Sequence, residues 1–307
     1  MSALRSLSVV VDAVAEPSPL RREAAIRSLP HARIYDSAEA LLSAERSLDA
    51  LIVCSPPSYH GTAILSGIRA GIHVLCEKPL TLDPEIFAQI QTESASRNVC
   101  VYSINNWAYS PQWRRLLEVA ASGRLGPIRH ADIRVLRTRP SVSASPNDWR
   151  KDPAISGGGI FVDHGWHNLY LMRRLLGPKI SIVDVVLHPR GSVDDVATAL
   201  FAAPAASGTI HLSWRSGERS NHAFVTGERG TAELRDDSLT IKSEGVEETT
   251  RFAEKLSGGS AHPEWLASMW PSFEAECGGM HRGENLAEAA FCLSSIRAAY
   301  GARETAS

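Results

Sequence analysis

The chain has 307 residues, of which 44% are hydrophobic and 21% are charged, an ordinary globular composition that excludes a disordered chain. Lys and Arg number 32 against 34 Asp and Glu, so the net charge of -2 offers no basic excess for binding nucleic acid. The length predicts two domains. Five scattered cysteines without a Cys-x-x-Cys pair exclude a disulfide framework and a structural zinc site, and they favour a cytoplasmic protein. No apolar run approaches the ~20 residues that span a bilayer, so we expect no membrane partner.

The first third of the chain alternates short apolar runs with helical patterns. Strands are expected at residues 9–15, 34–35, 50–54, 72–76 and 99–102. Helices are expected at residues 20–29, 37–46, 60–70 and 84–96, the last with Asp83 as its N-cap and Pro84 at its first position. Apolar strands separated by helices predict a parallel sheet covered on both faces, a layout typical of nucleotide-binding domains.

The pattern changes after about residue 105. A helix is expected at residues 111–122 and an amphipathic helix at residues 286–300. Between them we expect strands at residues 128–136, 180–188, 197–202, 209–214, 223–226 and 231–234. Several successive strands without intervening helices predict a mostly antiparallel sheet. The expected fold class is therefore α/β, with a Rossmann-like parallel sheet over residues 1–105 followed by an α+β domain with an open sheet over residues 106–307.

Three segments carry candidate chemistry, and the first is Cys76-Glu77-Lys78-Pro79 at the end of a predicted strand. Ligands of open α/β sheets bind beyond the carboxyl ends of the strands, so Lys78 can point at a ligand there. Its ammonium group could hydrogen-bond a reacting oxygen and stabilise developing charge. The alternative is a charged strand end that faces solvent.

The second segment contains Gly157-Gly158-Gly159 and continues through Asp163, His164 and His167. The glycines permit tight turns or close approach to a ligand. Asp163 and His167 are spaced i, i+4, so they share one helical face, and a carboxylate beside an imidazole is the usual arrangement of a general base. Two alternatives are an Asp-His pair that caps the helix and a metal site at Asp163, His164 and His167. No further cluster of ligating residues accompanies these three, so we expect no metal.

The third segment is Cys54-Ser55-Pro56-Pro57-Ser58-Tyr59-His60, where a strand end turns into a helix. The two prolines fix a rigid turn, and the helix N-terminus that follows favours anionic groups. By itself the segment is weak evidence, because most such turns are connectors.

Together the segments resemble the Gfo/Idh/MocA oxidoreductase family, named for glucose-fructose oxidoreductase and inositol dehydrogenase. The pieces that match, in family order and spacing, are Ser55-Pro56-Pro57-Ser58-Tyr59-His60, Ala70-Gly71-Ile72-His73-Val74-Leu75-Cys76-Glu77-Lys78-Pro79, Trp149-Arg150-Lys151-Asp152-Pro153 and the glycine run through Asp163 and His167. The likeness covers nearly the whole chain, since the second domain also reads as the family's open sheet.

The resemblance implies hydride transfer between nicotinamide and a secondary alcohol or carbonyl of a sugar, cyclitol or nucleotide sugar. It implies a catalytic group of Lys78, Asp163 and His167, with His167 as the proton carrier. Cofactor contacts are implied at Glu16, Ser55, Pro57, His60, Glu77, Lys78, Trp149 and Arg150. Aromatic and amide residues are expected to face the substrate: Asn106, Tyr109, Trp166 and Tyr170, with Asn105 and Trp107 beside them. Tyr170 stands where the family usually has Asp. A homo-oligomer through the second domain's sheet is also implied.

The cofactor implied by the resemblance is NAD or NADP. Glu16 follows the strand at residues 9–15, and its carboxylate would bind the adenosine ribose and repel a 2′-phosphate. Ser18, Arg21 and Arg22 lie nearby and could reverse this selectivity. The sequence therefore favours NAD only slightly.

The family's opening strand and its Gly-x-Gly-x-x-Gly turn have no counterpart here, because the first glycine of the chain is Gly61. Residues 9–15 then match the family's second strand, and residues 3–6 a remnant of its first helix. One interpretation is a start recorded too late, with the intact chemical motifs in its favour. The other is a non-catalytic member that binds a small molecule or a partner and has lost its phosphate site.

Overall fold

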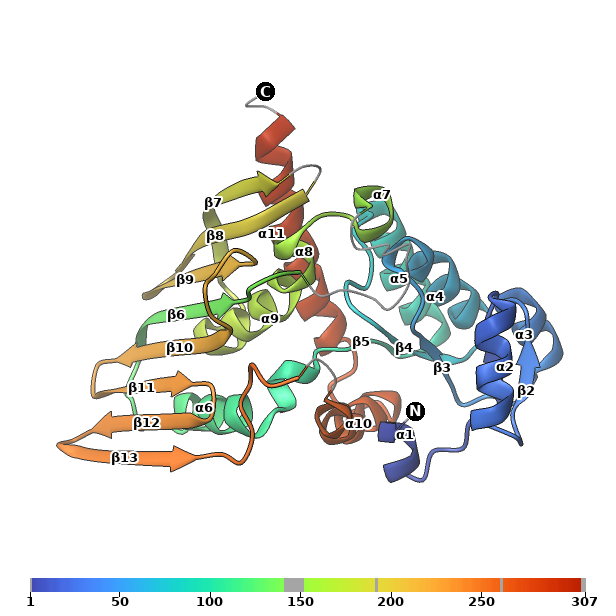
Figure 1. Ribbon diagram of the computed structural model, residues 1–307, viewed down its shortest axis with the longest axis horizontal. Coiled ribbons are helices and arrows are strands. Elements are labelled where there is room, and N and C mark those ends of the chain that lie inside the picture. The colour runs from blue at the N-terminus through green and yellow to red at the C-terminus, as the bar shows by residue number, and fades with distance from the viewer. Residues whose placement is uncertain (1, 141–151, 191–192, 260–261, 305–307) are drawn as a thin grey trace. The chain divides into compact units, whose positions relative to one another are not determined.

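The computed structural model describes residues 2–140, 152–190, 193–259 and 262–304 (Figure 1). It consists of two compact units, one comprising Met1–Ile104 with Met269–Leu286 and the other Asn105–Ser268 with Ala287–Ser307. The predicted division into residues 1–105 and 106–307 differs in placing 269–286 in the second domain. These residues join the first unit because Phe273 packs edge-on against Tyr102, with ring centroids 5.8 Å apart. Asn285 adds two hydrogen bonds to the Ser103 backbone, at 2.7 and 3.1 Å.

The first unit contains two separate parallel ladders (Figure 1). One pairs β1 (Ala13–Ala15) with β2 (Arg33–Tyr35), and the other has the order β3 (Ala50–Val53), β4 (His73–Cys76), β5 (Val101–Ser103). Helices precede or connect these strands: α1 (Ser2–Ser6), α2 (Pro19–Ser28), α3 (Ala38–Ala44), α4 (His60–Arg69) and α5 (Pro84–Arg97). The predicted parallel pairing is confirmed. Within the described part of the chain, no strand joins the two ladders.

The core of the first unit forms where α4 packs on β3, β4 and α5. Ile64 and Ile68 of α4 are fully buried, as is Val74 of β4. The start of α5 is as predicted, because the Asp83 carboxylate accepts hydrogen bonds from Glu85 N at 2.8 Å and Ile86 N at 3.1 Å. Such a cap satisfies backbone donors that a helix leaves unpaired at its N-terminus.

The second unit is built on one eight-stranded sheet of order β13-β12-β11-β10-β6-β9-β8-β7. Its strands are β6 (Ile128–Leu136), β7 (Ser181–Arg190), β8 (Val193–Ala203), β9 (Ala206–Ser213), β10 (Ser220–Gly227), β11 (Gly230–Arg235), β12 (Ser238–Ser243) and β13 (Val246–Arg251). All neighbours pair antiparallel except β6 and β9. The mostly antiparallel sheet is therefore confirmed.

Helices cover one face of this sheet. α6 (Pro111–Ala121) contacts β11 and β12, α8 (Ile160–Asp163) contacts β8 and β9, and α9 (Gly165–Leu176) contacts β6 and β9. Inward side chains such as Ile133 and Ile210 are buried, while Leu200 on the opposite face of β8 is 43% exposed. The remaining helical elements are η1 (Pro57–Tyr59), η2 (Asn106–Tyr109), α7 (Pro153–Ser156), α10 (Pro263–Cys277) and α11 (Glu284–Glu304). Within the described ranges, none of the helices has the length and apolarity needed to cross a membrane.

Candidate active site

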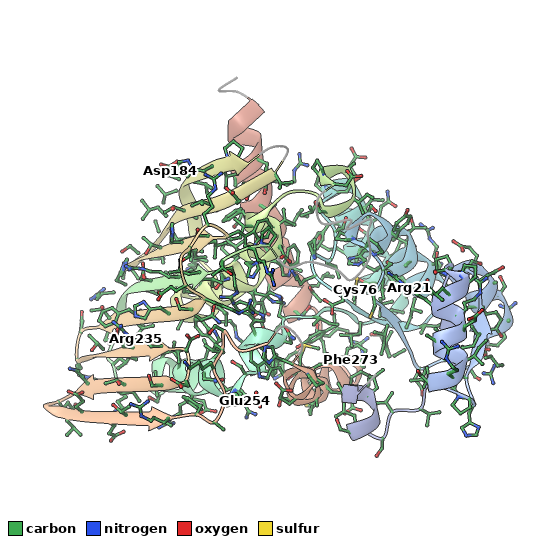
Figure 2. The ribbon with its side chains drawn as sticks, in the orientation of Figure 1. Arg21, Cys76, Asp184, Arg235, Glu254 and Phe273 are labelled. Carbon is green, nitrogen blue, oxygen red and sulfur yellow. The ribbon has the colours of Figure 1, made fainter. Side chains whose placement is uncertain are left out.

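A buried histidine joins two turns in the first unit. The turn after β3 contains Ser55, and the turn after β4 runs from Cys76 into Glu77-Lys78-Pro79 (Figure 2). His60 Nε2 lies 2.7 Å from the Ser55 carbonyl oxygen and Nδ1 lies 2.8 Å from that of Pro79. The ring is fully buried. His60 thus fixes the position of one turn against the other, and its predicted contact with the cofactor stays a prediction.

The same two turns offer groups that a ligand can engage. Ser55 Oγ is buried and has no hydrogen-bond partner among the described residues. Pro57 opens η1 at the start of the turn into α4, and Glu77 and Lys78 are half-buried beside the second turn. A buried hydroxyl that lacks a protein partner usually bonds a water or a ligand. At the carboxyl end of a parallel strand, this group fits a dinucleotide site.

Glu16 follows β1 directly, where the sequence predicts the acid that binds a ribose. Its Oε1 accepts a hydrogen bond from Ser18 N at 2.9 Å. Arg22 Nη1 donates to the carbonyl oxygens of Glu16 and Pro17, at 2.9 and 2.7 Å. The Arg22 guanidinium is therefore held against the turn that carries the Glu16 carboxylate.

In the second unit, the glycine run packs against the protein's own backbone. The Asp194 carboxylate on β8 accepts hydrogen bonds from Gly159 N and Phe161 N, both at 3.0 Å, and from the Tyr300 hydroxyl. A Cβ on Gly159 would lie 1.9 Å from the Asp194 carbonyl oxygen. One on Gly158 would lie 2.5 Å from the Tyr300 hydroxyl oxygen. Gly159 thus permits close packing against β8 and Gly158 against Tyr300 of α11, uses that the sequence pattern could not distinguish from ligand approach.

The two candidate catalytic residues of this unit lie in an aromatic cluster. The His167 ring stacks on Trp107, with centroids 5.0 Å apart and planes 6° apart. Asp163 Oδ2 lies 3.4 Å from Nδ1 of His164, and the His164 ring meets the edges of Trp107 and Trp214, each at 6.1 Å. His164 keeps helical backbone angles between α8 and α9, so Asp163 and His167 retain their spacing of one helical turn. Acid and imidazole groups are gathered here in a partly buried setting suited to proton transfer.

Sequence reasoning missed two members of this cluster, Arg137 and Trp214. The Arg137 guanidinium lies over the Trp107 ring at 6.0 Å, and its side chain donates to Asn221 Oδ1 at 3.0 Å. Burial lowers the pKa of Arg137 to about 10, Arg219 adds to the decrease, and Asp236 and Asp163 oppose it. Arg137 and Trp214 directly follow β6 and β9, the one parallel pair of the sheet. The two residues lie at one edge of the sheet, because the carboxyl ends of neighbouring parallel strands share an edge, and no sequence pattern indicated this pairing.

The structure distributes the predicted substrate-facing residues differently. Asn106 and Tyr109 lie in η2 and are half-buried, whereas Trp166 is fully buried and Tyr170 is 2% exposed. The Tyr170 ring lies under the Arg174 guanidinium at 5.7 Å, and burial raises the pKa of its hydroxyl. Trp166 and Tyr170 are core residues of α9, and the substrate contact expected of them has no support in these contacts. Trp149 and Arg150 lie outside the described residues.

The second unit also offers the side chain of Asn105, which precedes η2. It is 1% exposed, and neither its amide oxygen nor its amide nitrogen has a hydrogen-bond partner among the described residues. An unpaired buried amide is costly, so a ligand that bonds it gains affinity.

Two polar clusters lie outside these candidate groups. In the described residues, the metal-ligating groups that converge within 4.8 Å are Glu254, His262 and Glu264, and Asp163 is not among them. The expectation that Asp163, His164 and His167 hold no metal stays a prediction.

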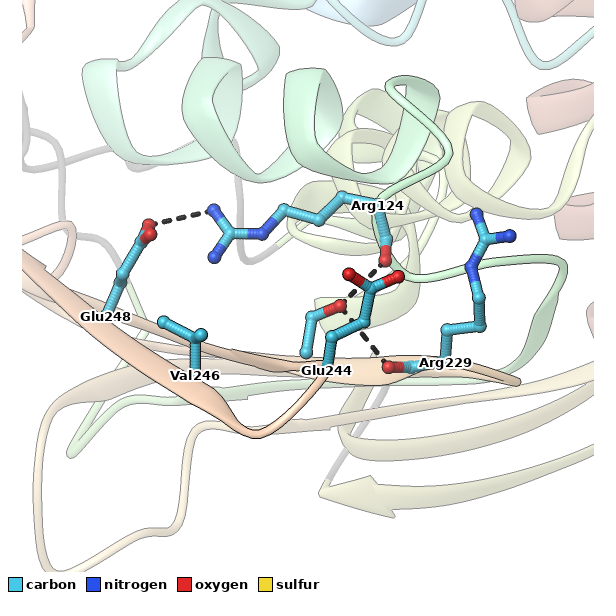
Figure 3. Close-up of a pocket in the computed structure, with 6 residues that line it drawn as sticks. Arg124, Arg229, Glu244, Val246 and Glu248 are labelled. Atoms are coloured by element: carbon cyan, nitrogen blue, oxygen red, sulfur yellow. Dashed lines mark hydrogen bonds and ion pairs between the residues drawn. The ribbon is translucent and has the colours of Figure 1, made fainter.

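A surface pocket on the hairpins of the sheet is lined by Arg124, Arg229, Ser243, Glu244, Val246 and Glu248 (Figure 3). Arg124 pairs with Glu248 at 2.8 Å, and Ser243 Oγ donates to the Arg124 carbonyl oxygen at 2.9 Å. The pocket is lined by two Arg and two Glu side chains, so their formal charges cancel. It contains no candidate site residue.

The fold combines a Rossmann-like unit with a mostly antiparallel sheet, and comparison with known proteins identifies the class. Residues 3–105 match a family model described as an oxidoreductase family with an NAD-binding Rossmann fold. Residues 113–233 match the GFO/IDH/MocA C-terminal domain. The chain belongs to the Gfo/Idh/MocA oxidoreductase family.

Individual relatives are distant. Inositol 2-dehydrogenase from Rhizobium meliloti is 28% identical over 184 residues, covering 57% of this chain and 53% of that protein. The chain thus aligns with about half the length of this curated relative. KijD10, a 3-ketoreductase from Actinomadura kijaniata solved with NADP and TDP-benzene, has a TM-score of 0.79 at 21% identity, covering 97% and 92% of the two chains. An inositol dehydrogenase homologue from Azotobacter vinelandii solved with NAD+ has a TM-score of 0.76 at 19% identity, covering 94% and 85%. Both structures share the fold of this chain.

Proposed function

We propose that this chain is an NAD(P)-dependent oxidoreductase that interconverts a secondary alcohol and a carbonyl on a sugar, cyclitol or nucleotide sugar. The observation that carries the proposal is the stacking of His167 on Trp107, beside the Asp163–His164 pair. An imidazole that is held in place next to a carboxylate can exchange a hydroxyl proton near neutral pH. Family membership supports the redox half of the reaction.

The roles divide between the two units. A bound nicotinamide would supply or accept the hydride. Lys78 donates a hydrogen bond to the reacting oxygen and stabilises negative charge on it. His167 takes the proton from the alcohol in oxidation and returns it in reduction, while Asp163 stabilises the imidazolium form. The Trp107 ring holds the plane of the His167 imidazole.

NAD is the proposed cofactor in preference to NADP. The Glu16 carboxylate lies at the end of β1 and would repel a 2′-phosphate. Arg22, a candidate phosphate-binding residue, already donates to two backbone carbonyls of the same turn. The relatives leave the choice open, since KijD10 was solved with NADP and the Azotobacter homologue with NAD+.

A homo-oligomer through the open face of the second unit's sheet is part of the proposal. That face carries Leu200 at 43% exposure and, on the neighbouring strand β7, Val186 at 48% exposure. Apolar side chains on an uncovered sheet face favour burial against another copy. A cytoplasmic location stays a prediction from cysteine usage.

The test is turnover of a polyol panel, including myo-inositol and simple glucosides, followed as NADH or NADPH absorbance. Lys78→Met and His167→Ala are each expected to lower kcat by about 10²- to 10⁴-fold. Lys179→Met and His31→Ala change exposed residues and serve as matched controls. Wild-type turnover in both site variants would overturn the proposal. A folded chain that binds a polyol but neither dinucleotide in calorimetry would support the non-catalytic interpretation instead.

A further inference from the structure

Two cysteines of the first unit lie near the contact between α10 and β5. Phe273 on α10 (Figure 2) packs against Tyr102 on β5, with ring centroids 5.8 Å apart. Cys277 lies four residues after Phe273, on the same face of the helix, and Cys100 lies two residues before Tyr102, on the same face of the strand. The two thiols therefore lie on the same side of this contact, and an interaction between them shifts the pKa of each.

Backbone contacts hold both partners in place. Cys100 N donates to Nδ1 of His73 at 3.0 Å, and the Cys100 carbonyl oxygen accepts from Val74 N at 2.8 Å. Arg282 donates from Nη1 to the Asn98 carbonyl oxygen at 2.6 Å and from Nη2 to the carbonyl oxygen of Cys277. One guanidinium thus clamps the end of α10 to the residue two positions before Cys100.

The two thiols differ in protonation and access. Interaction with the Cys100 thiol lowers the pKa of Cys277, and Arg282 acts in the same direction against the effect of burial. Interaction with the Cys277 thiol and burial raise the pKa of Cys100. Cys277 is half-buried, whereas Cys100 is 2% exposed. Cys277 is therefore the thiolate that a small oxidant reaches, with Cys100 as its protonated neighbour.

We propose that Cys277 and Cys100 form a redox-active dithiol, which a hydroperoxide oxidises to an intramolecular disulfide. The Cys277 thiolate attacks the peroxide, so that an S–O bond forms, the O–O bond breaks and the leaving hydroxide or alkoxide takes up a proton. Cys100 sulfur then attacks the sulfenic acid of Cys277. The S–S bond forms, the S–O bond breaks, and water leaves with the Cys100 proton. Two electrons pass from the thiols to the peroxide, and the product ties α10 covalently to β5.

The experiment exposes the reduced full chain to hydrogen peroxide, blocks the remaining thiols with N-ethylmaleimide and maps the peptides by mass spectrometry. The expected result is loss of both alkylatable thiols at Cys100 and Cys277, with recovery of the peptide that joins them. Dithiothreitol should restore both. Circular dichroism and the melting temperature verify that each sample is folded, and the oxidised chain is expected to melt at a higher temperature because the cross-link restricts its unfolded state.

Single variants separate the roles of the two sulfurs. Cys100→Ser should accumulate a sulfenic acid at Cys277 that dimedone traps, and Cys277→Ser should leave Cys100 reduced. Cys54→Ser changes an exposed cysteine and is the matched control, which should form the linked peptide like the wild type. Oxidation of Cys54 while Cys277 stays reduced would overturn the proposal. A Cys277 sulfinic acid without any linked peptide in the wild type would also overturn it.

Discussion

The two units are both built on β-sheet, but they hold their strands together in different ways. The strands of the first unit are three or four residues long and form two separate parallel ladders. Those of the second unit run from six to eleven residues in one continuous sheet. Short ladders have few backbone hydrogen bonds, so the first unit depends more on side chains that tie turns and elements together, such as His60 and Asn285.

The two units also hold their candidate site residues in different ways. In the first unit, the candidate cofactor residues sit on turns, and His60 links those turns through two carbonyl oxygens. In the second unit, the candidate catalytic cluster sits on helices that a buried carboxylate, Asp194, anchors to β8. We therefore expect single substitutions to disturb the linked turns in the first unit and the anchoring of the helices to β8 in the second.

The largest expected effect is in the second unit. Asp194→Ala leaves Gly159 N and Phe161 N without their acceptor, and each buried unpaired donor costs about 1–3 kcal/mol. The free energy of unfolding should fall by about 3–5 kcal/mol, measured by urea denaturation. Asp184→Ala removes an exposed carboxylate on β7 (Figure 2) and should change stability little. Equal stability of the two variants would contradict the anchoring role of Asp194.

A smaller effect is expected in the first unit from Asn285→Ala. Asn285 Oδ1 accepts from Ser103 N at 2.7 Å, and its loss leaves that buried amide unpaired at a cost of about 1–3 kcal/mol. Hydrogen exchange should show faster exchange in β3, β4 and β5, with the eight-stranded sheet unchanged. Uniform loss of protection in both units would show that the two units unfold as one.

Activity should respond moderately to loss of the aromatic stack in the second unit. Trp107→Leu removes the ring on which His167 lies, a contact worth about 0.5–1.5 kcal/mol. We expect kcat/KM to fall about threefold to tenfold while Tm changes little. Trp265→Leu removes a similar stack on His262 and is the matched control. A Trp107→Leu enzyme with unchanged kcat/KM would show that the stack does not position the imidazole.

The smallest expected effect is an opposite dependence of stability on pH in the two units. In the first unit, hydrogen bonds from Arg33 and Tyr35 lower the pKa of Glu45 below its ordinary value of 4.5. Its contribution to stability is present above the unfolded pKa and is lost as pH falls through the folded one. In the second unit, burial raises the pKa of Glu288 above 4.5, so stability decreases as pH rises through that higher pKa.

Melting temperatures of the Gln variants between about pH 3.5 and about pH 7.5 test both signs. Glu45→Gln should lose stability against the wild type mainly at the high end of this range. Glu288→Gln should gain stability against the wild type over the same part of the range. Parallel pH profiles for the two variants would contradict this opposition.

Much of the fold could be predicted because local patterns report it. Apolar runs located β3 and β4, and the strand at residues 128–136 has the same bounds as β6. β13 was missed because all six of its residues are exposed and no apolar alternation marks it. α10 was missed, and the grouping of residues 269–286 with the first unit was not foreseen, because only a contact with β5 that is distant in sequence reveals where they pack.

Part of the candidate site could likewise be predicted from the sequence, and part of it could not. Residue type and spacing pointed to Lys78, Asp163 and His167, since a lysine after a strand and an acid one helical turn from a histidine are local features. Arg137 and Trp214 could not be found in this way. Residues 137–205 separate β6 from β9 in the sequence, and the two strands become neighbours only in the sheet.

Short-range periodicity and motifs were enough to predict most of the helices and strands, the family and the residue types available for proton transfer. Which groups became neighbours depended on long-range packing: Asp194 with the glycine run, Trp107 with His167, and Tyr102 with Phe273. Those pairings depend on strand register and on the packing of helices against sheets, which join residues far apart in the chain and leave no local periodic signal.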